Sequence, residues 1–309
     1  MRDAPLLRWF APAPARRLAL LRILVGGFAL GYLLVRSVHL IGFGGFAADR
    51  FDPVFVVDLL VDDPLPAWAV TGAVLAAIAA GAAFVAGWRY RITGPLFAVL
   101  LLWVTTYRNS WGLVLHTENL MVLHVFVLGF VPAADALSLD ARGGGSSGER
   151  RDPRYGWPVK LLMLVTVLTY FVAGWAKVRN GGWDWITGDV LRNQIAHDNL
   201  RKLHLGDVYS PLGGWLTAHA AWLFPPLAAA TQAVELGAPL AMLSARLGRL
   251  WTAGAWLFHA GILALMAIVF PYQVLGVAFA PFFRVEAGYD RVVAAMRRRR
   301  ARAAARSPG

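Results

Sequence analysis

The chain alternates between long apolar blocks and short loops that carry most of its charged side chains. A helix needs about 20 apolar residues to cross a hydrocarbon core of ~30 Å, and the blocks have about this length. Blocks such as residues 67–87 are apolar on every face, whereas apolar and polar residues alternate in the strands of a transmembrane β-barrel. The pattern therefore predicts an all-α, polytopic integral membrane protein.

We expect about eight spans, packed as a helical bundle. The first apolar block has no clean small-residue cleavage site, which favours a retained span over a cleaved signal peptide. Pro271 predicts a sharp turn between the last two spans, since proline cannot continue a helix cleanly, and one kinked span over 251–284 is the alternative. The predicted spans are residues 18–36, 67–87, 94–107, 117–133, 159–177, 219–243, 251–269 and 272–284.

The placement of arginine predicts the orientation, because loops rich in lysine and arginine stay in the cytoplasm. Such arginines occur in the N-terminal segment 1–17, in the linker 134–158 and in the basic tail 285–309. Both ends then lie on one side, which requires an even number of spans. We therefore expect a multi-pass protein of the plasma membrane with cytoplasmic N- and C-termini, whose tail binds anionic lipid.

Two loops between predicted spans are long. Residues 143–148 of the cytoplasmic linker are glycine and serine, a composition typical of a flexible connection. The outer-side loop 178–218 has an apolar face, which predicts an interfacial or re-entrant helix. The apolar residues of this face are Trp183, Trp185, Leu191, Ile195, Leu203 and Leu205.

Charge and composition argue against several kinds of partner and functional site. The net charge of +12 does not indicate a nucleic-acid partner, because the basic residues lie in loops and at the two ends. The chain has no cysteine, which excludes disulfides, thiolate nucleophiles and cysteine metal sites. The histidines in predicted spans form no HxxxH pair and have no carboxylate at a spacing typical of a metal site, so we expect no metal.

Lys177 is the most informative polar residue, because an ionisable side chain inside a span is costly unless it is paired or hydrated. Only three of the 30 basic residues are lysine, so lysine here indicates a need for an amine. A partly buried lysine can act as a neutral base, whereas arginine cannot. Tyr170 and Gly174 lie on the same helix face, where glycine leaves room for a ligand. The alternative is a lysine that snorkels from a span end.

Further ionisable or polar side chains in predicted spans are candidates for the same reason. His116 and Asn119 lie about one turn apart at the start of the fourth span, near its outer side. Glu235 and His259 lie in the sixth and seventh spans, where an interhelical hydrogen bond is the alternative role. Arg22 in the first span could be the counter-ion of Glu235. The other ionisable residues of this group are Glu118 and His124.

One stretch of the chain has a distinctive motif. Residues 169–177 are rich in aromatic side chains and end in AG-x-x-K at Lys177, and a W-x-x-G at Trp185 and then His197 follow. This pattern resembles the central motif of vitamin K-dependent γ-carboxylase. Residues 116–140 and 258–283 also fit.

The chain is therefore similar to the HTTM domain proteins, the superfamily that contains this carboxylase, and we expect an HTTM-like transmembrane domain over residues 18–284. The resemblance implies a shared bundle and a pocket for reduced vitamin K or menaquinol. It implies that Lys177 is the catalytic base and that His116 is a second catalytic residue, although two extra residues follow Trp111 in this chain. The substrate-binding residues are then expected to be Tyr170, Gly174, Asn119, Trp185, His197, Glu235 and His259.

Three functions are compatible with these features. The first is an epoxidase-type membrane enzyme that acts on a reduced naphthoquinone; the chain ends soon after the last predicted span, so we do not expect protein carboxylation. The second is a non-catalytic or maturation helper that binds a secreted peptide or toxin through the loop 178–218. The third is a transporter, for which no inverted repeat is evident. The lipid bilayer is a partner in all three.

Overall fold

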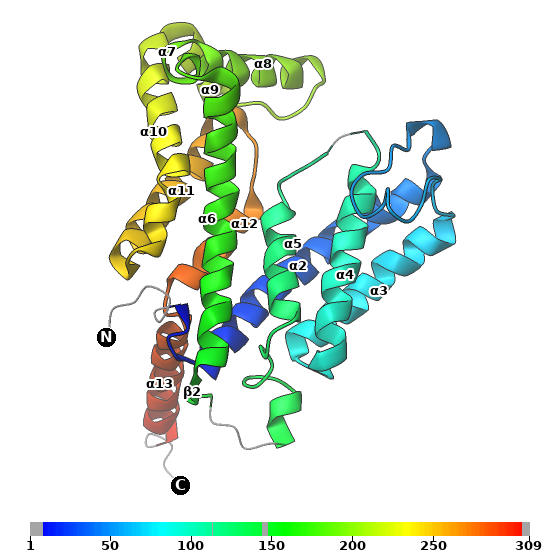
Figure 1. Ribbon diagram of the computed structural model, residues 1–309, viewed down its shortest axis with the longest axis vertical. Coiled ribbons are helices and arrows are strands. Elements are labelled where there is room, and N and C mark those ends of the chain that lie inside the picture. The colour runs from blue at the N-terminus through cyan, green and yellow to red at the C-terminus, as the bar shows by residue number, and fades with distance from the viewer. Residues whose placement is uncertain (1–8, 113, 144–147, 305–309) are drawn as a thin grey trace. The chain divides into compact units, whose positions relative to one another are not determined.

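The computed structural model describes residues 9–112, 114–143 and 148–304, and these form two compact units (Figure 1). Unit 1 comprises Met1–Leu162 and Phe283–Gly309, and unit 2 comprises Met163–Phe282. The first boundary falls inside one continuous helix, α6 (Pro153–Gly181). Most of the glycine and serine run of the linker, residues 144–147, lies outside the described residues.

The described residues are helical apart from loops and one short ladder. In this ladder β1 (Ala13–Pro14) pairs with β2 (Arg151–Asp152) in an antiparallel register. The prediction of an all-α fold is confirmed.

Four helices of unit 1 pack one against the next: α2 on α3, α3 on α4, and α4 on α5, which also contacts α2 (Figure 1). Their bounds are α2 (Ala15–Gly42), α3 (Ala67–Ala86), α4 (Tyr90–Asn109) and α5 (Asn119–Gly129). Gly94 and Gly129 face each other where α4 meets α5, and a Cβ on Gly94 would lie 2.6 Å from the carbonyl oxygen of Gly129. Glycine therefore sets the close approach of these two helices. The connections include η1 (Phe43–Gly45), η2 (Ala48–Arg50) and η3 (Asp140–Gly143).

Arg22 is fully buried in α2 and is bound to the turn that follows α5. Its guanidinium donates to the carbonyl oxygens of Ala133 at 3.0 Å and Leu137 at 2.6 Å. Non-helical carbonyls in an apolar interior need donors, and arginine supplies several in a fixed geometry. The expected pairing of Arg22 with Glu235 is wrong, because Glu235 pairs with Lys177.

The basic tail begins as α13 (Val285–Ala304), which contacts α2 within unit 1. Arg17 donates to both carboxylate oxygens of Glu286, at 2.8 and 2.5 Å, and Arg16 pairs with Asp290. Burial acts to raise the pKa of Glu286, but the hydrogen bonds and the charge of Arg17 outweigh it, so this pKa lies below its ordinary value. These ion pairs join the start of α13 to the start of α2.

Unit 2 consists of the second part of α6 and the elements from α7 to η6, with α11 (Ala245–Met266) packed against α8, α9 and α10. Asn199 of α8 donates to the carbonyl oxygen of Leu265 at 2.9 Å, which satisfies one free acceptor at the end of α11. The other elements are α7 (Asp184–Thr187), α8 (Val190–His204), α9 (Pro211–His219), η4 (Ala221–Leu223), α10 (Phe224–Leu236), η5 (Ala238–Met242), α12 (Pro271–Val274) and η6 (Val277–Phe282).

Three helices in the described part of the chain are long and apolar enough to cross a membrane: Ala15–Gly45, Ala67–Ala86 and Pro153–Gly181. They correspond to the predicted spans 18–36, 67–87 and 159–177. The shorter apolar helix Asn119–Gly129 occupies the centre of the predicted span 117–133. The count of about eight spans stays a prediction.

Two predicted spans are not single helices. Residues 272–284 contain only the short α12 and the 3-10 helix η6, and residues 219–243 are divided among η4, α10 and η5. Proline explains the division at the chain end, since Pro271 begins α12 and Pro281 lies in η6. Residues 178–218, expected to hold an interfacial helix, form α7, α8 and α9, whose position at a membrane surface stays a prediction.

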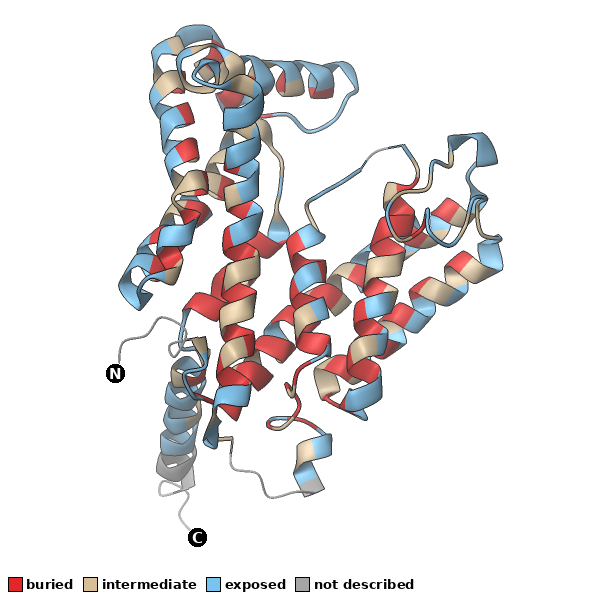
Figure 2. Cartoon of the chain, in the orientation of Figure 1, coloured by how far each residue is buried: buried red, intermediate tan, exposed pale blue. Residues whose placement is uncertain are grey.

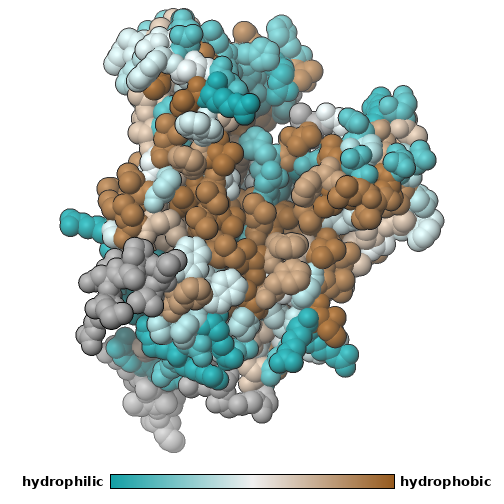
Figure 3. Space-filling model, in the orientation of Figure 1, coloured by the Kyte–Doolittle hydropathy of each residue, from teal (hydrophilic) through white to brown (hydrophobic). Residues whose placement is uncertain are grey.

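Large apolar side chains are exposed on the helices of both units. Figure 2 marks the exposed positions along the chain, and Figure 3 shows apolar surface on the face in view. Val35 and Val38 of α2 are each 84% exposed, and Leu257 of α11 is 63% exposed. A soluble protein rarely leaves so much apolar surface in water, and a bilayer would cover it. The structure is therefore compatible with a membrane protein.

Candidate functional site

Lys177 and Glu235 form a close ion pair in unit 2. Lys177 lies near the end of α6 and Glu235 near the end of α10, and Nζ is 2.6 and 2.7 Å from the two carboxylate oxygens. The Glu235 side chain is 4% exposed and that of Lys177 is 22% exposed. An unpaired buried charge is costly, so each side chain stabilises the charged form of the other. Lys177 is thus held by a protein carboxylate rather than only extended to a membrane surface.

Two aromatic rings complete the surroundings of the ammonium group. Nζ of Lys177 lies 5.1 Å from the ring centre of Trp185 in α7 and 5.7 Å from that of Phe258 in α11. Both distances are within reach of a cation–π attraction, which strengthens where water is excluded. Four helices of unit 2 therefore contribute to one site around Lys177.

A second polar pair lies two turns earlier on α6. The hydroxyl of Tyr170 is 2.7 Å from Nε2 of His259, and both residues are 5% exposed. The ring of Tyr170 also lies edge-on to that of Phe258, at 6.5 Å between centres. Phe258 is thus a neighbour of both the Tyr170–His259 pair and Lys177.

Three buried polar atoms of these helices have no hydrogen-bond partner among the described residues. They are Nδ1 of His259, Oε1 of Gln232 and Nε1 of Trp185. Gln232 lies one turn before Glu235 on α10. A buried polar atom without a partner costs about 1–3 kcal/mol, so such atoms are typical of places that a water or a ligand occupies.

Gly174 has a different role from the one expected. A Cβ at this position would lie 2.7 Å from Cβ of Glu235 and 3.2 Å from the backbone nitrogen of Leu236. The space beside the glycine is filled by α10, so the expectation that Gly174 leaves room for a ligand is wrong. Gly174 instead lets α6 and α10 approach closely enough for Glu235 to reach Lys177.

An apolar groove of about 390 Å³ runs between α8, α10 and α11. Its lining includes Leu191, Ile195, Val234 and Leu257, and Phe258 forms part of the same wall. Because Phe258 also faces Nζ of Lys177, the groove and the ion pair share one side chain.

His116 and Asn119 lie in unit 1, in and directly after the loop that joins α4 to α5. His116 is exposed, and its carbonyl oxygen accepts a hydrogen bond from the backbone nitrogen of Asn119 at 3.2 Å. His197 lies exposed on α8 of unit 2 and takes part in none of the contacts described above. The structure thus gathers Lys177, Glu235, Trp185, Tyr170 and His259 within unit 2.

Arg108 is a polar residue of unit 1 that the sequence did not single out. It is 6% exposed and pairs with Glu118 at 2.9 Å. At the end of an apolar block an arginine resembles an ordinary loop residue, and the one available signal was the acid ten residues later. In the described part of the chain no group of three histidine, aspartate or glutamate side chains is placed to hold a metal ion.

Comparison with known protein families gives a match to the HTTM domain over residues 10–286. No curated protein and no solved structure matches the chain significantly. The HTTM domain occurs in vitamin K-dependent carboxylase-like proteins. Because the match covers most of the sequence, the chain belongs to the HTTM domain family.

Proposed function

We propose that this protein is a membrane enzyme that uses dioxygen to oxidise a reduced naphthoquinone, such as reduced vitamin K or menaquinol, to its epoxide. One oxygen atom enters the epoxide, and the other leaves as water with the two hydroxyl protons of the quinol. The observation that carries the proposal is the Lys177–Glu235 pair beside an apolar groove. The site offers an amine for proton transfer and apolar space for a lipid-soluble ligand. The occurrence of the HTTM domain in carboxylase-like proteins supports the same chemistry.

Lys177 is the base in this proposal. Transfer of the ammonium proton to Glu235 within the pair leaves a neutral amine and a neutral carboxylic acid, so the base forms without a change of net charge in apolar surroundings. The amine then accepts the proton of the substrate hydroxyl. Lysine can take both protonation states, which is what a general base requires.

The unsatisfied polar atoms supply further contacts for such a substrate. A quinol has two hydroxyl groups, each of which donates and accepts, and Nδ1 of His259 and Oε1 of Gln232 need partners. The groove has a volume within the range of about 300–1,000 Å³ common for small-molecule sites, and it suits an apolar tail. His116 is the second proposed catalytic residue, as a proton donor during oxygen chemistry.

Turnover by the purified protein tests this function. In lipid nanodiscs under air, reduced menaquinone or vitamin K should be converted to the epoxide, measured by chromatography with mass spectrometry, and no epoxide should form without oxygen. His116→Ala should lower the rate by about 10²–10⁴-fold, the usual contribution of a general acid or base. His39→Ala, an exposed histidine of the same unit, serves as the matched control. Failure of the wild type to bind reduced naphthoquinone would refute the proposal and favour the peptide-maturation helper.

We also propose that both termini lie in the cytoplasm and that the number of spans is even, about eight. The ion pairs between the starts of α2 and α13 support a common side for the two ends. A reporter that is active only in the cytoplasm should work when fused after residue 143 and at the C-terminus, and a periplasmic reporter should work between residues 46 and 66. Periplasmic activity at the C-terminus with a cytoplasmic N-terminus would show an odd number of spans.

A further inference from the structure

The loop between α4 and α5 carries an exposed histidine, His116, yet it is fixed at several points; residue 113 of this loop lies outside the described residues. Near its start, Trp111 packs against three phenylalanines. The distances between ring centres are 6.0 Å to Phe43, 5.6 Å to Phe46 and 5.0 Å to Phe51. The first half of the loop is therefore anchored by aromatic packing.

Asn109, the last residue of α4, holds the loop directly before His116. Its Oδ1 accepts a hydrogen bond from the backbone nitrogen of Leu115 at 3.2 Å, and its Nδ2 donates to the carbonyl oxygen of the same residue at 3.1 Å. One amide side chain thus satisfies both polar groups of Leu115. This double contact fixes the position and the direction of the backbone that leads into His116.

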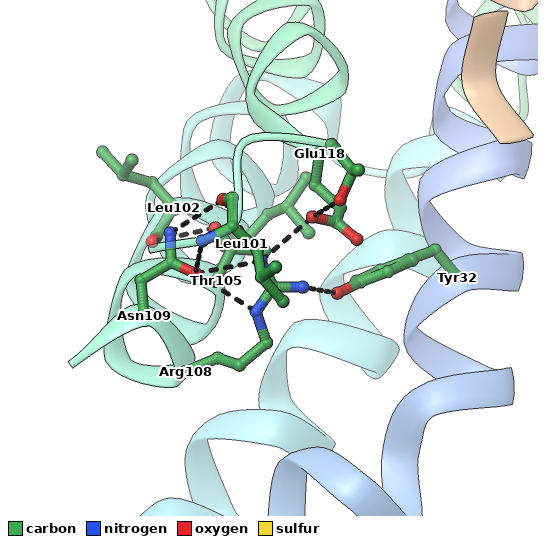
Figure 4. Close-up of polar contacts among 9 residues, drawn as sticks. Tyr32, Leu101, Leu102, Thr105, Arg108, Asn109 and Glu118 are labelled. Carbon is green, nitrogen blue, oxygen red and sulfur yellow. Dashed lines mark hydrogen bonds and ion pairs between the residues drawn. The ribbon is translucent and has the colours of Figure 1, made fainter. Parts of the chain in front are cut away.

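Arg108 holds the loop directly after His116. Its Nη2 donates to Oε2 of Glu118 at 2.9 Å, and its Nη1 donates to the hydroxyl of Tyr32 in α2 at 2.7 Å (Figure 4). The guanidinium also donates to Oδ1 of Asn109, at 3.3 Å from Nε and 3.0 Å from Nη2. Neighbouring residues of α4 therefore grip the chain on both sides of the histidine.

The burial of this cluster argues for a role in positioning. The side chains of Arg108 and Glu118 are 5% and 14% exposed. A buried ion pair adds little stability compared with apolar side chains of the same volume, but its hydrogen bonds define one geometry. The geometry defined here is that of a loop whose histidine remains exposed.

We infer that Arg108 and Asn109 are positioning residues that fix His116 for its proton-transfer role. The proton-transfer role of His116 rests on the proposed function, whereas the contacts that fix the loop are a property of unit 1. Arg108 orients Asn109 and holds Glu118, and Asn109 holds Leu115, so His116 is presented at a constant place. Loss of the contacts made by Arg108 or by Asn109 makes the loop mobile, while His116 itself is retained.

The absence of cysteine allows a direct test of loop mobility. His116→Cys provides a single site for a nitroxide spin label in the full-length protein in nanodiscs. Asn109→Leu, similar in volume but unable to bond to Leu115, should convert an immobile electron paramagnetic resonance spectrum into a mobile one. Asn193→Leu, at an exposed position of α8, is the matched control and should leave the spectrum unchanged. An unchanged spectrum with Asn109→Leu would overturn the inference.

Activity with His116 present gives the second measurement. Asn109→Leu should lower kcat on the order of ten- to a hundredfold with little change in KM, because a misplaced group loses rate more than binding. Arg108→Lys keeps the positive charge but loses the planar set of hydrogen-bond donors. Its kcat should lie between that of wild type and that of Arg108→Met. A mobile label together with an unchanged kcat would overturn the positioning role. If Asn109→Leu makes the label mobile but the wild type does not oxidise quinol, the proposed function is refuted. The inference that Asn109 fixes the loop then still stands.

Discussion

Replacement of Lys177 by arginine is expected to lower quinol oxidation by about 10²–10⁴-fold while the protein remains folded. Arginine retains the positive charge and can pair with Glu235 through two parallel hydrogen bonds, so the ion pair survives. A guanidinium keeps its proton at any accessible pH and cannot act as the base. The rate of epoxide formation and the thermal stability are measured for wild type and variant. A lost rate with unchanged stability identifies Lys177 as the base.

Lys160→Arg is the matched control for this substitution, because Lys160 lies on the same helix and the exchange is chemically identical. It should keep full activity. If Lys177→Arg turned over the quinol as fast as wild type, Lys177 would be a structural partner of Glu235 and the proposed base would be wrong.

Replacement of Glu235 by leucine is expected to destabilise the protein by about 3 kcal/mol, the lower end of the range for breaking a buried ion pair. The substitution leaves the Lys177 ammonium among aromatic and apolar side chains, and the partial exposure of Lys177 moderates the cost. Unfolding titrations of the purified protein in mixed detergent measure the change in the free energy of unfolding.

The double variant Lys177→Met/Glu235→Leu should recover most of the lost stability, since it removes both charges together. Glu149→Leu, which removes an exposed carboxylate from the linker, should leave the free energy of unfolding within about 0.5 kcal/mol of wild type. A Glu235→Leu variant as stable as wild type would show that the pair with Lys177 does not contribute to the free energy of unfolding.

The sequence by itself determined the class of the fold. Apolar blocks of membrane-spanning length leave no alternative to helices, because every backbone polar group must be satisfied within its own segment. For the same reason the helices α2, α3 and α6 fall where the first, second and fifth blocks predicted them. The family could also be predicted from the sequence, because the motif that ends at Lys177 is a local pattern.

The sequence also indicated which polar residues were out of place. An ionisable side chain in an apolar block is visible without any structure, and this singled out Lys177, Glu235 and His259. It could not pair them correctly. Arg22 was expected as the counter-ion of Glu235, and the actual partner depended on distances between segments that are far apart in the chain.

Only the tertiary structure decided these pairings. Gly174 brings α10 against α6 so that Glu235 meets Lys177, whereas Arg22 is turned to the carbonyl oxygens after α5. The grip of Arg108 and Asn109 on both sides of His116 was hidden for the same reason. Hydropathy depends on each residue alone, while an ion pair depends on the packing of two helices, and that packing arises only when the bundle has formed.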